Sequence, residues 1–437
     1  MAASAPLSDG ATQAKVIVVG AGPVGLFAAL RLAQAGVKVD VMEKDAELSD
    51  MPRAAGYHGG ALVALARARV LDKALDMGWV ARGMCWRKPV TDDGEGGKKY
   101  GDIVARLPFP SGDPNSITSN TPALVLPQSK LSKLLLDEAK ATGLVTVNFN
   151  MELAAIQDNG DSVKATFTRA GSGAHETYEA AFLVGADGGK STTRKLLNIP
   201  FKGHSWPERL VTIDCVFETP RTVESDVPIS FIIHPVHFGV VLPLEPLEPG
   251  KRSTYRCAVA VDPRDARSDE ELTSKESVNV LLNKMLPGPR PVNAEVLRAA
   301  PYRTHQLCAS TFRRGRCVLA GDAAHLNNPF GAMGLTSGLL DAEALADSLD
   351  LIINWRKPLT LLDVYSCERQ RVFQTFASPV STMNKLRCAI DPEHADEDWL
   401  IRSLNSNPPS SLEEYGRQFY DTWRTDMRSL VGGVPSS

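Results

Sequence analysis

Three glycine-bearing segments, far apart in the chain, have the residue types and spacing of turns that bind phosphate and sugar groups. They are Gly20-Ala21-Gly22-Pro23-Val24-Gly25, Gly185-Ala186-Asp187-Gly188 and Gly321-Asp322-Ala323-Ala324-His325. Each segment follows an apolar run, so each turn is expected at the end of a buried strand. Glycine lets the backbone approach a ligand closely, and an aspartate carboxylate accepts hydrogen bonds from sugar hydroxyls. The three turns together predict a bound nucleotide cofactor.

The first segment fits a dinucleotide-binding unit of strand, turn and helix. An apolar strand over residues 15–19 precedes it, and a helical pattern over residues 24–35 follows and ends at Gly36. A second strand over residues 37–42 is followed by Glu43 and Lys44, about where an acid accepts hydrogen bonds from the ribose of an adenine dinucleotide. We expect the pyrophosphate at the positive N-terminus of the helix, beside Gly20, Gly22, Pro23, Val24 and Gly25.

The composition indicates a globular protein that binds small molecules. The 437 residues are 43% hydrophobic and 23% charged with a net charge of -3, and no basic tract suggests nucleic acid as a partner. No segment approaches the roughly 18 apolar residues of a membrane span, and residues 1–14 lack the pattern of a signal peptide. The seven cysteines are scattered without a CxxC pair, which favours neither disulfides nor a metal site. We expect a cytoplasmic protein with a disordered leader over residues 1–14.

The order of the expected elements predicts an α/β fold with a discontinuous Rossmann-type domain. Strand-like stretches separated by Pro-rich turns fill residues 210–261, which predicts an inserted, mostly antiparallel sheet before the chain returns at residues 316–320. The expected parts are a dinucleotide-binding domain at residues 15–75, 120–200 and 305–355, a substrate-binding domain at 76–119 and 201–304, and a helical C-terminal segment at 356–437.

With all three segments considered, the chain resembles the group A flavoprotein monooxygenases, the family of the para-hydroxybenzoate, phenol and polyketide hydroxylases. The resemblance covers residues 15–349, and the three motifs occur in the family's order and spacing. It implies that the dinucleotide-binding domain binds FAD, that Asp187 lies near the pyrophosphate, and that Asp322 holds the ribityl chain. A helix cap is the structural alternative for Asp187.

The stretch after the third turn resembles the segment that closes the flavin ring pocket in this family. The positions carried over are Gly321, Asp322, Pro329, Gly331, Gly334, Leu335 and Thr336. Ala332 stands where glycine is frequent, and Thr336 where asparagine is frequent. Arg53 resembles an arginine that contacts the ADP portion and borders the ring, and Gln128 a glutamine that reaches the flavin side chain; a solvated charge and a polar group at a helix N-terminus are the alternatives. His325 is expected to order its turn rather than to do chemistry.

The resemblance implies the chemistry of an aromatic hydroxylase. NADPH, with NADH as the alternative, would reduce FAD, oxygen would form a flavin hydroperoxide, and the distal oxygen would pass to a carbon ortho or para to a phenolate. The helix that begins near Leu335 would point its N-terminal amides at the ring, where negative charge accumulates on reduction. The expected substrate is a phenolic or polyketide aromatic compound, and a homodimer is the family-level expectation.

The general base is harder to identify from the sequence. A base is useful because a phenol, with a pKa of about 10, is less nucleophilic than its phenolate. His234 and His237 lie on or beside the expected substrate sheet, and Tyr57 follows the loop expected to face the flavin. Arg209 is a candidate for holding a phenolate or carboxylate. A structural hydrogen bond is the alternative for each histidine, so the base stays open.

Two other functions fit the same motifs. A flavin-dependent quinone or polyprenoid oxidoreductase would use them without hydroxylation, and a flavin-binding sensor or interaction protein would belong to a different class. A flavin halogenase is less well supported, because the chain lacks the WxWxIP segment. The sequence favours the monooxygenase and leaves its substrate open.

Overall fold

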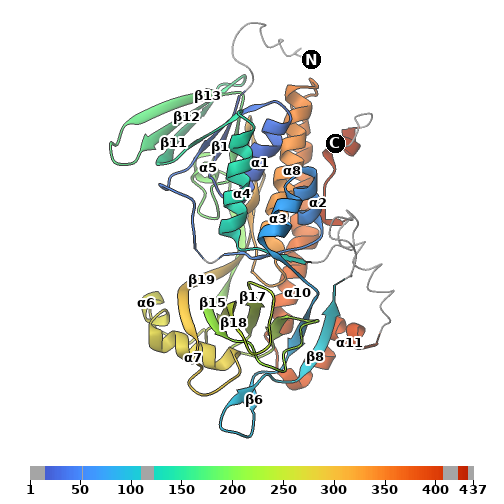
Figure 1. Cartoon of the computed structure of the whole chain (residues 1–437). Coiled ribbons are helices and arrows are strands. Elements are labelled where there is room, and N and C mark those ends of the chain that lie inside the picture. The colour runs from blue at the N-terminus through green and yellow to red at the C-terminus, as the bar shows by residue number, and fades with distance from the viewer. Residues whose placement is uncertain (1–14, 52, 110–122, 407–421, 432–437) are drawn as a thin grey trace.

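The computed structural model describes residues 15–51, 53–109, 123–406 and 422–431, and Figure 1 shows how its elements are arranged. Two large sheets dominate, one in the upper and one in the lower half of that view, and the chain passes between them more than once. The predicted α/β class with an inserted, mostly antiparallel sheet is confirmed. The predicted leader over residues 1–14 lies outside the described residues.

The first domain is built on a six-stranded sheet with the order β10-β2-β1-β14-β21-β20. Its strands are β1 (Lys15–Val19), β2 (Lys38–Met42), β10 (Val145–Asn148), β14 (Phe182–Gly185), β20 (Arg313–Arg314) and β21 (Cys317–Leu319). All neighbouring strands are parallel except β20 and β21. Because Val19, Gly185 and Leu319 lie in register at the carboxyl ends of β1, β14 and β21, the three glycine turns meet at one edge of the sheet.

Helices and smaller sheets cover this sheet and supply the rest of its core. The helices are α1 (Pro23–Gln34), α2 (Gly60–Arg67), α3 (Leu71–Met77), α4 (Gln128–Ala141), α5 (Thr192–Leu196) and α8 (Met333–Ile353). The smaller sheets join β11 (Met151–Asp158), β12 (Val163–Arg169) and β13 (His175–Ala180), and β3 (Gly56–Tyr57), β9 (Ala123–Val125) and β4 (Trp79–Ala81). Helix α8 packs against α1, α2 and the later α9, and every side chain from Thr336 to Ile352 is buried. Acidic side chains on such a helix need internal partners.

The second domain is built on an eight-stranded sheet with the order β22-β19-β15-β18-β17-β16-β5-β8. Its strands are β5 (Gly83–Arg87), β8 (Ile103–Pro108), β15 (Phe201–Glu218), β16 (Ile229–Ile232), β17 (Gly239–Pro243), β18 (Arg252–Ala260), β19 (Glu295–Ala309) and β22 (His325–Leu326). Alternate residues of β15 point to opposite faces, so Val211 joins one core cluster with α7 (Lys275–Met285) and Leu210 joins another with Phe330. The second cluster contains Phe330, so this face of the sheet packs against the chain that follows the third glycine turn.

The structure divides several segments that the sequence pattern joined. Residues 269–285 form two helices, α6 (Asp269–Leu272) and α7, because Ser268 and Ser274 each cap an N-terminus with a side-chain oxygen. Residues 177–184 are likewise divided, since β13 ends at Ala180 and β14 begins at Phe182. The Gly-rich stretch after Thr91 forms a small hairpin of β6 (Thr91–Asp92) and β7 (Lys98–Lys99).

The described C-terminal residues are mainly helical and contact both domains. They form α9 (Leu361–Val372), a π-helical turn (Phe373–Ala377), α10 (Ser378–Cys388), a 3-10 helix (Pro392–Glu397), α11 (Trp399–Ser406) and α13 (Met427–Val431). Helix α11 contacts β8 of the second domain, whereas α13 returns to α8 of the first. Within the described ranges, no helix has both the length and the apolar character needed to cross a membrane.

Candidate functional site

The turn after β1 leaves open space at the N-terminus of α1. Gly20 has a positive φ of 104°, its N–H donates to the carbonyl oxygen of Met42 over 2.8 Å, and a Cβ there would lie 2.5 Å from the oxygen of Ala186. A Cβ on Gly22, in contrast, would have no heavy atom within 4 Å. Gly20 is therefore fixed by packing, whereas Gly22 borders space that a phosphate can enter beside the first amides of α1.

Glu43 organises this turn from the end of β2. Its Oε2 accepts the N–H of Ala21 over 2.7 Å, and its Oε1 accepts the N–H of Asp45 over 3.0 Å. Glu43 is half-buried and Lys44 is exposed. These bonds show what the carboxylate does within the turn, and contact of Glu43 and Lys44 with a ribose stays a prediction.

The second segment is held by a helix cap and by an arginine. Asp187 accepts from Ser191 Oγ over 2.5 Å and from the N–H and hydroxyl of Thr193 over 2.9 and 3.0 Å. Its carboxylate therefore bonds to the start of α5, whose N-cap residue is Ser191, and its contact with a cofactor stays a prediction. The buried Arg194 then joins two segments, because its guanidinium donates to the oxygens of Gly189 and Ala323 over 2.8 Å each.

The third turn is held in place by the side chain of Asp341 in α8. Gly321, with a φ of 61°, donates its N–H to Asp341 Oδ2 over 3.0 Å, and His325 Nε2 lies 2.7 Å from the same oxygen. Arg369 of α9 donates to Asp341 Oδ1 over 2.7 Å. Burial alone would raise the pKa of Asp341, but His325 and Arg369 lower it to about 2. The buried His325 therefore has contacts suited to ordering the turn.

Asp322 differs from its neighbours because its carboxylate has no hydrogen-bond or ion-pair partner among the described residues. It lies half-buried in the 3-10 turn Gly321–Ala323, and burial raises the pKa of its carboxyl group, opposed by the charges of His325 and Arg53. A desolvated acceptor of this kind gains from hydroxyl donors. Its position at the end of β21 suits the hydroxyls of a ribityl chain.

The loop that follows leads into the N-terminus of α8. The carbonyl oxygen of Gly331 accepts from His58 Nε2 over 2.9 Å, and Ala332 adopts the left-handed conformation with a φ of 53°. In the described part of the chain, the buried Asn327 Nδ2 and Thr336 Oγ1 have no hydrogen-bond partner. Pro329 is exposed, and Gly334 and Leu335 are half-buried in the first turn of the helix. Free amides and two unpaired polar groups thus gather at one helix N-terminus.

Arg53 and Gln128 border this region from the side of the first domain. Arg53 is exposed, and its carbonyl oxygen accepts from the guanidinium of Arg256. Gln128 is the first residue of α4, and its N–H donates to the oxygen of Ala54 over 2.9 Å. A cleft of about 280 Å³ between the domains is lined by Gln128 together with Asp214 and Arg256. The contacts of Arg53 and Gln128 with a flavin stay predictions.

The sequence analysis missed a polar group on the neighbouring face of the second sheet. Asp214 of β15 and Arg256 of β18 stand opposite each other, and their side chains form two bonds of 2.7 Å while only 15% and 10% exposed. Burial raises the pKa values of Tyr57 and Tyr302, and the charge of Arg256 opposes both shifts. The Tyr57 hydroxyl is buried without a hydrogen-bond partner among the described residues. An arginine directly before the apolar run of residues 257–261 was the signal in the sequence.

The other three catalytic candidates lie elsewhere on the second sheet. Arg209 donates to Asp269 over 3.0 Å, and His237 lines a groove of about 550 Å³ beside α7, on the face of the sheet opposite Phe330. His234 Nδ1 accepts the N–H of His237 over 2.8 Å within a tight turn. Burial lowers the pKa of both histidines. Among the described residues, the hydrogen bonds of these three side chains involve no residue of the loop at Gly331, and their catalytic roles stay predictions.

The residues present fit FAD. The open space at Gly22 lies at a helix N-terminus, the unpaired carboxylate of Asp322 stands at the next turn, and the unpaired groups of Asn327 and Thr336 lie beyond it. A pyrophosphate, a polyhydroxyl chain and a polar ring edge occur in that order in FAD. The open space at Gly22, the carboxylate of Asp322 and the polar groups of Asn327 and Thr336 therefore occur in the same order as the parts of FAD that each could bind.

Comparisons with known proteins agree with this fit. A family described as "FAD binding domain" matches residues 13–378. The chain is 32% identical over 373 residues to a para-nitrophenol 4-monooxygenase of Pseudomonas sp. (strain WBC-3), which covers 84% of this chain and 86% of that protein. It is also 32% identical over 400 residues to a 6-hydroxy-3-succinoylpyridine 3-monooxygenase of Pseudomonas putida (strain DSM 28022 / S16), covering 90% and 94%.

Solved structures show the same architecture. The crystal structure of a p-nitrophenol 4-monooxygenase from Pseudomonas putida DLL-E4 matches with a TM-score of 0.80 and 29% identity, covering 93% of this chain and 97% of that one. A complex of aklavinone-11 hydroxylase with FAD and aklavinone matches with a TM-score of 0.73 at 24% identity, covers 89% of this chain and 71% of that one, and supports the fold alone. The chain therefore belongs to the FAD-binding-domain family and is a FAD-dependent aromatic monooxygenase of the para-hydroxybenzoate hydroxylase-like group.

Proposed function

We propose that this enzyme hydroxylates a phenol-type aromatic compound, with molecular oxygen as co-substrate and NADPH, or alternatively NADH, as reductant. The proposal rests on one observation: Arg256 lies on the face of the second sheet that packs against Phe330. Its guanidinium contacts the carbonyl oxygen of Arg53, and its sheet face is continuous with the core around Phe330. A ring on this face would lie beside the loop that leads into α8.

The side chains on this face are suited to a phenolate. The Tyr57 hydroxyl is a buried donor in need of an acceptor, and the positive charge of Arg256 favours an oxyanion over a neutral hydroxyl. A phenolate ring carries more electron density at its ortho and para carbons than the phenol does. We therefore assign Tyr57 to binding the substrate oxygen and Arg256 to lowering its pKa, with Asp214 fixing the guanidinium.

Aromatic side chains would cover the ring and exclude water. Phe330 lies 6.3 Å from Phe231 and 5.4 Å from Phe238 between ring centroids. When bound, FAD supplies the electron transfer and oxygen activation that side chains lack. The protein's contribution is to orient the two rings and keep water out of the space between them.

The names of the relatives support the substrate class. One is named for a nitrophenol and another for a hydroxypyridine, and both of these compounds carry a hydroxyl group on the ring. We extend that chemistry to this chain as a proposal, with a polyketide aromatic compound as the larger alternative. A cytoplasmic location and a homodimer belong to the same proposal and are tested by cell fractionation and by light scattering.

Oxygen-18 labelling tests the proposed reaction. Purified protein with bound FAD is incubated with NADPH or NADH under ¹⁸O₂ and a panel of 4-nitrophenol, 3-hydroxyphenylpropionate and 6-hydroxynicotinate. We expect one substrate to accelerate NADPH oxidation and to give a product that carries one atom of ¹⁸O. Tyr57→Phe should lower the rate with that substrate and leave FAD content unchanged.

Other outcomes would favour the alternative functions. Reduction of a quinone by NADPH, with no labelled product from any phenol, would support the non-hydroxylating oxidoreductase. Bound FAD that NADPH and NADH both fail to reduce would support the sensor.

A further inference from the structure

The described part of the chain's end, residues 422–431, lies against α8 of the first domain. Trp423 is fully buried there, and its Nε1–H donates to Ser337 Oγ over 2.8 Å. The carbonyl oxygen of Trp423 and the hydroxyl of Thr425 accept from Arg369 over 2.8 and 3.1 Å. Trp423 is thus packed against the first turns of α8, the helix that follows the loop at Gly331.

Arg369 connects Trp423 to the turn at Gly321. While Nη1 binds the Trp423 carbonyl, Nε donates to Asp341, whose second carboxylate oxygen accepts the Gly321 N–H. Trp423, Arg369 and Asp341 are each at most 1% exposed. Hydrogen bonds in such a dry environment are stronger than in water, and losing one partner leaves the next polar group unsatisfied.

A second contact leads from Trp423 to the loop at Gly331. The ring of His58 lies 5.6 Å from the ring of Trp423, and His58 Nε2 donates to the Gly331 oxygen. Trp423 therefore neighbours the groups that hold both parts of the chain expected to surround the flavin. The turn at Gly20 is held separately, by Met42 and Glu43.

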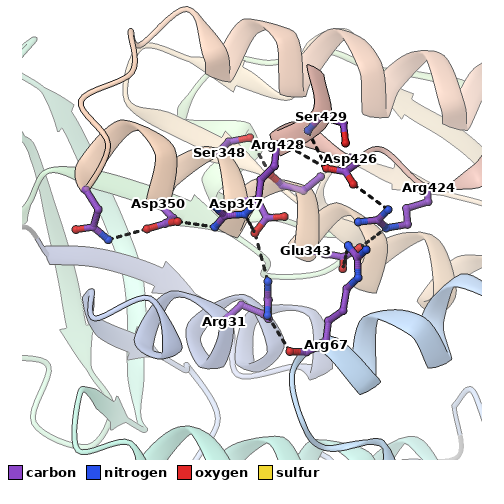
Figure 2. Close-up of polar contacts among 12 residues, drawn as sticks. Arg31, Arg67, Glu343, Asp347, Ser348, Asp350, Arg424, Asp426, Arg428 and Ser429 are labelled. Carbon is purple, nitrogen blue, oxygen red and sulfur yellow. Dashed lines mark hydrogen bonds and ion pairs between the residues drawn. The ribbon is translucent and has the colours of Figure 1, made fainter. Parts of the chain in front are cut away.

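Charge complementarity fixes the same segment to α8, as Figure 2 shows. Three buried acids of α8 face arginines from α1, α2 and the C-terminal segment; the pairs are Arg31–Asp347 (3.3 Å), Arg67–Glu343 (3.4 Å), Arg424–Glu343 (3.1 Å), Arg428–Asp347 (3.4 Å) and Arg428–Asp350 (2.5 Å). Without the segment, three buried carboxylates would have two arginines. Uncompensated buried charge is costly, so docking of the segment is specific.

We propose that Trp423 is a positioning residue for FAD: docking of residues 422–431 holds the turn at Gly321 and the loop at Gly331 in the shape that receives the ribityl and flavin parts. The ADP part, bound at the turn of Gly20 to Gly25, is independent of this docking. The inference rests on the proposed arrangement of FAD along the three turns. It adds a C-terminal determinant of flavin affinity that lies far in sequence from all three motifs.

The test compares two ligands on the full-length protein. Dissociation constants for FAD and for ADP are measured by calorimetry on apoprotein of the wild type, Trp423→Ala and Trp423→Phe. We expect Trp423→Ala to weaken FAD by about tenfold or more, because it removes the buried indole ring and its hydrogen bond to Ser337 and so loosens the docked segment, and to change ADP by less than about twofold. Trp423→Phe, which keeps a ring but loses the bond to Ser337, should fall between the wild type and Trp423→Ala.

Controls separate this effect from general instability. Trp355, which is 52% exposed, supplies the matched control, and Trp355→Ala should leave both constants unchanged. If Trp423→Ala yields no folded protein, Trp423→Phe and Arg428→Gln carry the comparison, since Arg428 docks the segment from its other end. A selective loss of FAD affinity in those variants supports the proposal.

Two results would overturn it, and a third concerns the cofactor site itself. Equal weakening of FAD and ADP would mean that Trp423 acts on the stability of the whole domain. Unchanged FAD affinity in folded Trp423 variants would remove its positioning role. Failure of ADP to compete with FAD on the wild type would instead overturn the proposed arrangement of FAD.

Discussion

The turns after β1 and β21 both present glycines at the same edge of one sheet, yet they are held in different ways. The first turn is fixed by the oxygen of Met42 and the carboxylate of Glu43, within one strand–helix–strand unit. The third turn depends on Asp341, which depends in turn on Arg369 and on the C-terminal segment. In the proposed arrangement of FAD, the side that binds the adenosine part is thus local in sequence, whereas the side that binds the flavin part depends on long-range packing.

The largest effect is expected where that long-range packing is broken at its centre. Asp341→Asn would leave the Arg369 guanidinium buried without its counter-charge, which costs about 3–5 kcal/mol of unfolding free energy. Asp363→Asn is the matched control, because Asp363 is 65% exposed in its pair with Arg313 and such pairs contribute about 0–1 kcal/mol. Urea unfolding of both variants measures the difference. Equal losses would contradict the central place of Asp341.

Gly22→Val tests the local half of the comparison. A Cβ at this position would have no heavy atom within 4 Å, so the fold should persist, but the side chain would enter the space proposed for the pyrophosphate and should weaken FAD at least about 100-fold, near 2.7 kcal/mol. Flavin content of the purified protein and its circular dichroism provide the measurement. Normal flavin content would refute the phosphate site, and Gly22→Ala should give a smaller loss.

The acids of α8 predict a pH dependence. Glu343 lies between Arg67 and Arg424 with Asp347, Asp426 and Arg31 nearby, and burial nevertheless raises its pKa to about 7. Because the folded-state pKa lies above the ordinary 4.5, stability from this group is complete below pH 4.5 and is lost as the pH rises through about 7.

Glu343→Gln should remove this slope. We expect the free energy of unfolding of the wild type to fall relative to that of the variant between pH 5 and 8, by on the order of 2 kcal/mol. Parallel curves for the two proteins would mean that Glu343 does not titrate in this range. Glu368→Gln, at an i,i+3 pair with Arg371 in which Glu368 is half-buried, is the control and should not change the slope.

Asp322→Ala should have a smaller and more specific effect. The carboxylate has no partner to leave unsatisfied, so stability should be kept or slightly raised, while loss of its bonds to ribityl hydroxyls should weaken FAD by about tenfold, or 1.4 kcal/mol. Fluorescence titration of the apoprotein with FAD measures this, beside Asp76→Ala on the exposed face of α3 as the control. An unchanged constant would remove the ribityl contact.

The smallest effect concerns the left-handed residue at the start of α8. Ala332→Gly should relieve the strain of a φ of 53° and stabilise the fold by roughly 0.5–1 kcal/mol after the entropy of glycine in the unfolded chain is subtracted. Arg356→Gly, at an exposed position with the same φ, should stabilise similarly. Thermal unfolding compares them, and a change in FAD affinity is expected for Ala332→Gly alone.

Sequence reasoning succeeded where structure follows from neighbouring residues. The strand over residues 15–19 was predicted as observed, and the helix predicted over residues 24–35 is observed at Pro23–Gln34, because apolar periodicity and turn residues are local signals. Strand β19 was missed, because its 15 residues lack a regular alternation of apolar and polar side chains and few of them are buried. The pair of Asp214 and Arg256 was missed because only the register between β15 and β18 places the two residues opposite each other.

The sequence by itself determined the α/β class, the three turns, the family and the need for FAD. Each of these follows from short motifs in which a strand and its glycine turn are neighbours in the chain. The tertiary structure alone decided which polar side chains lie on the sheet face next to the loop at Gly331. It placed Tyr57 and Arg256 on that side, and Arg209 and His237 on the opposite side. It also decided that Trp423 lies against Arg369 and Ser337, far from it in the sequence. Sheet register, side-chain direction and burial bring distant residues together, and none of these has a signature within a short window of sequence.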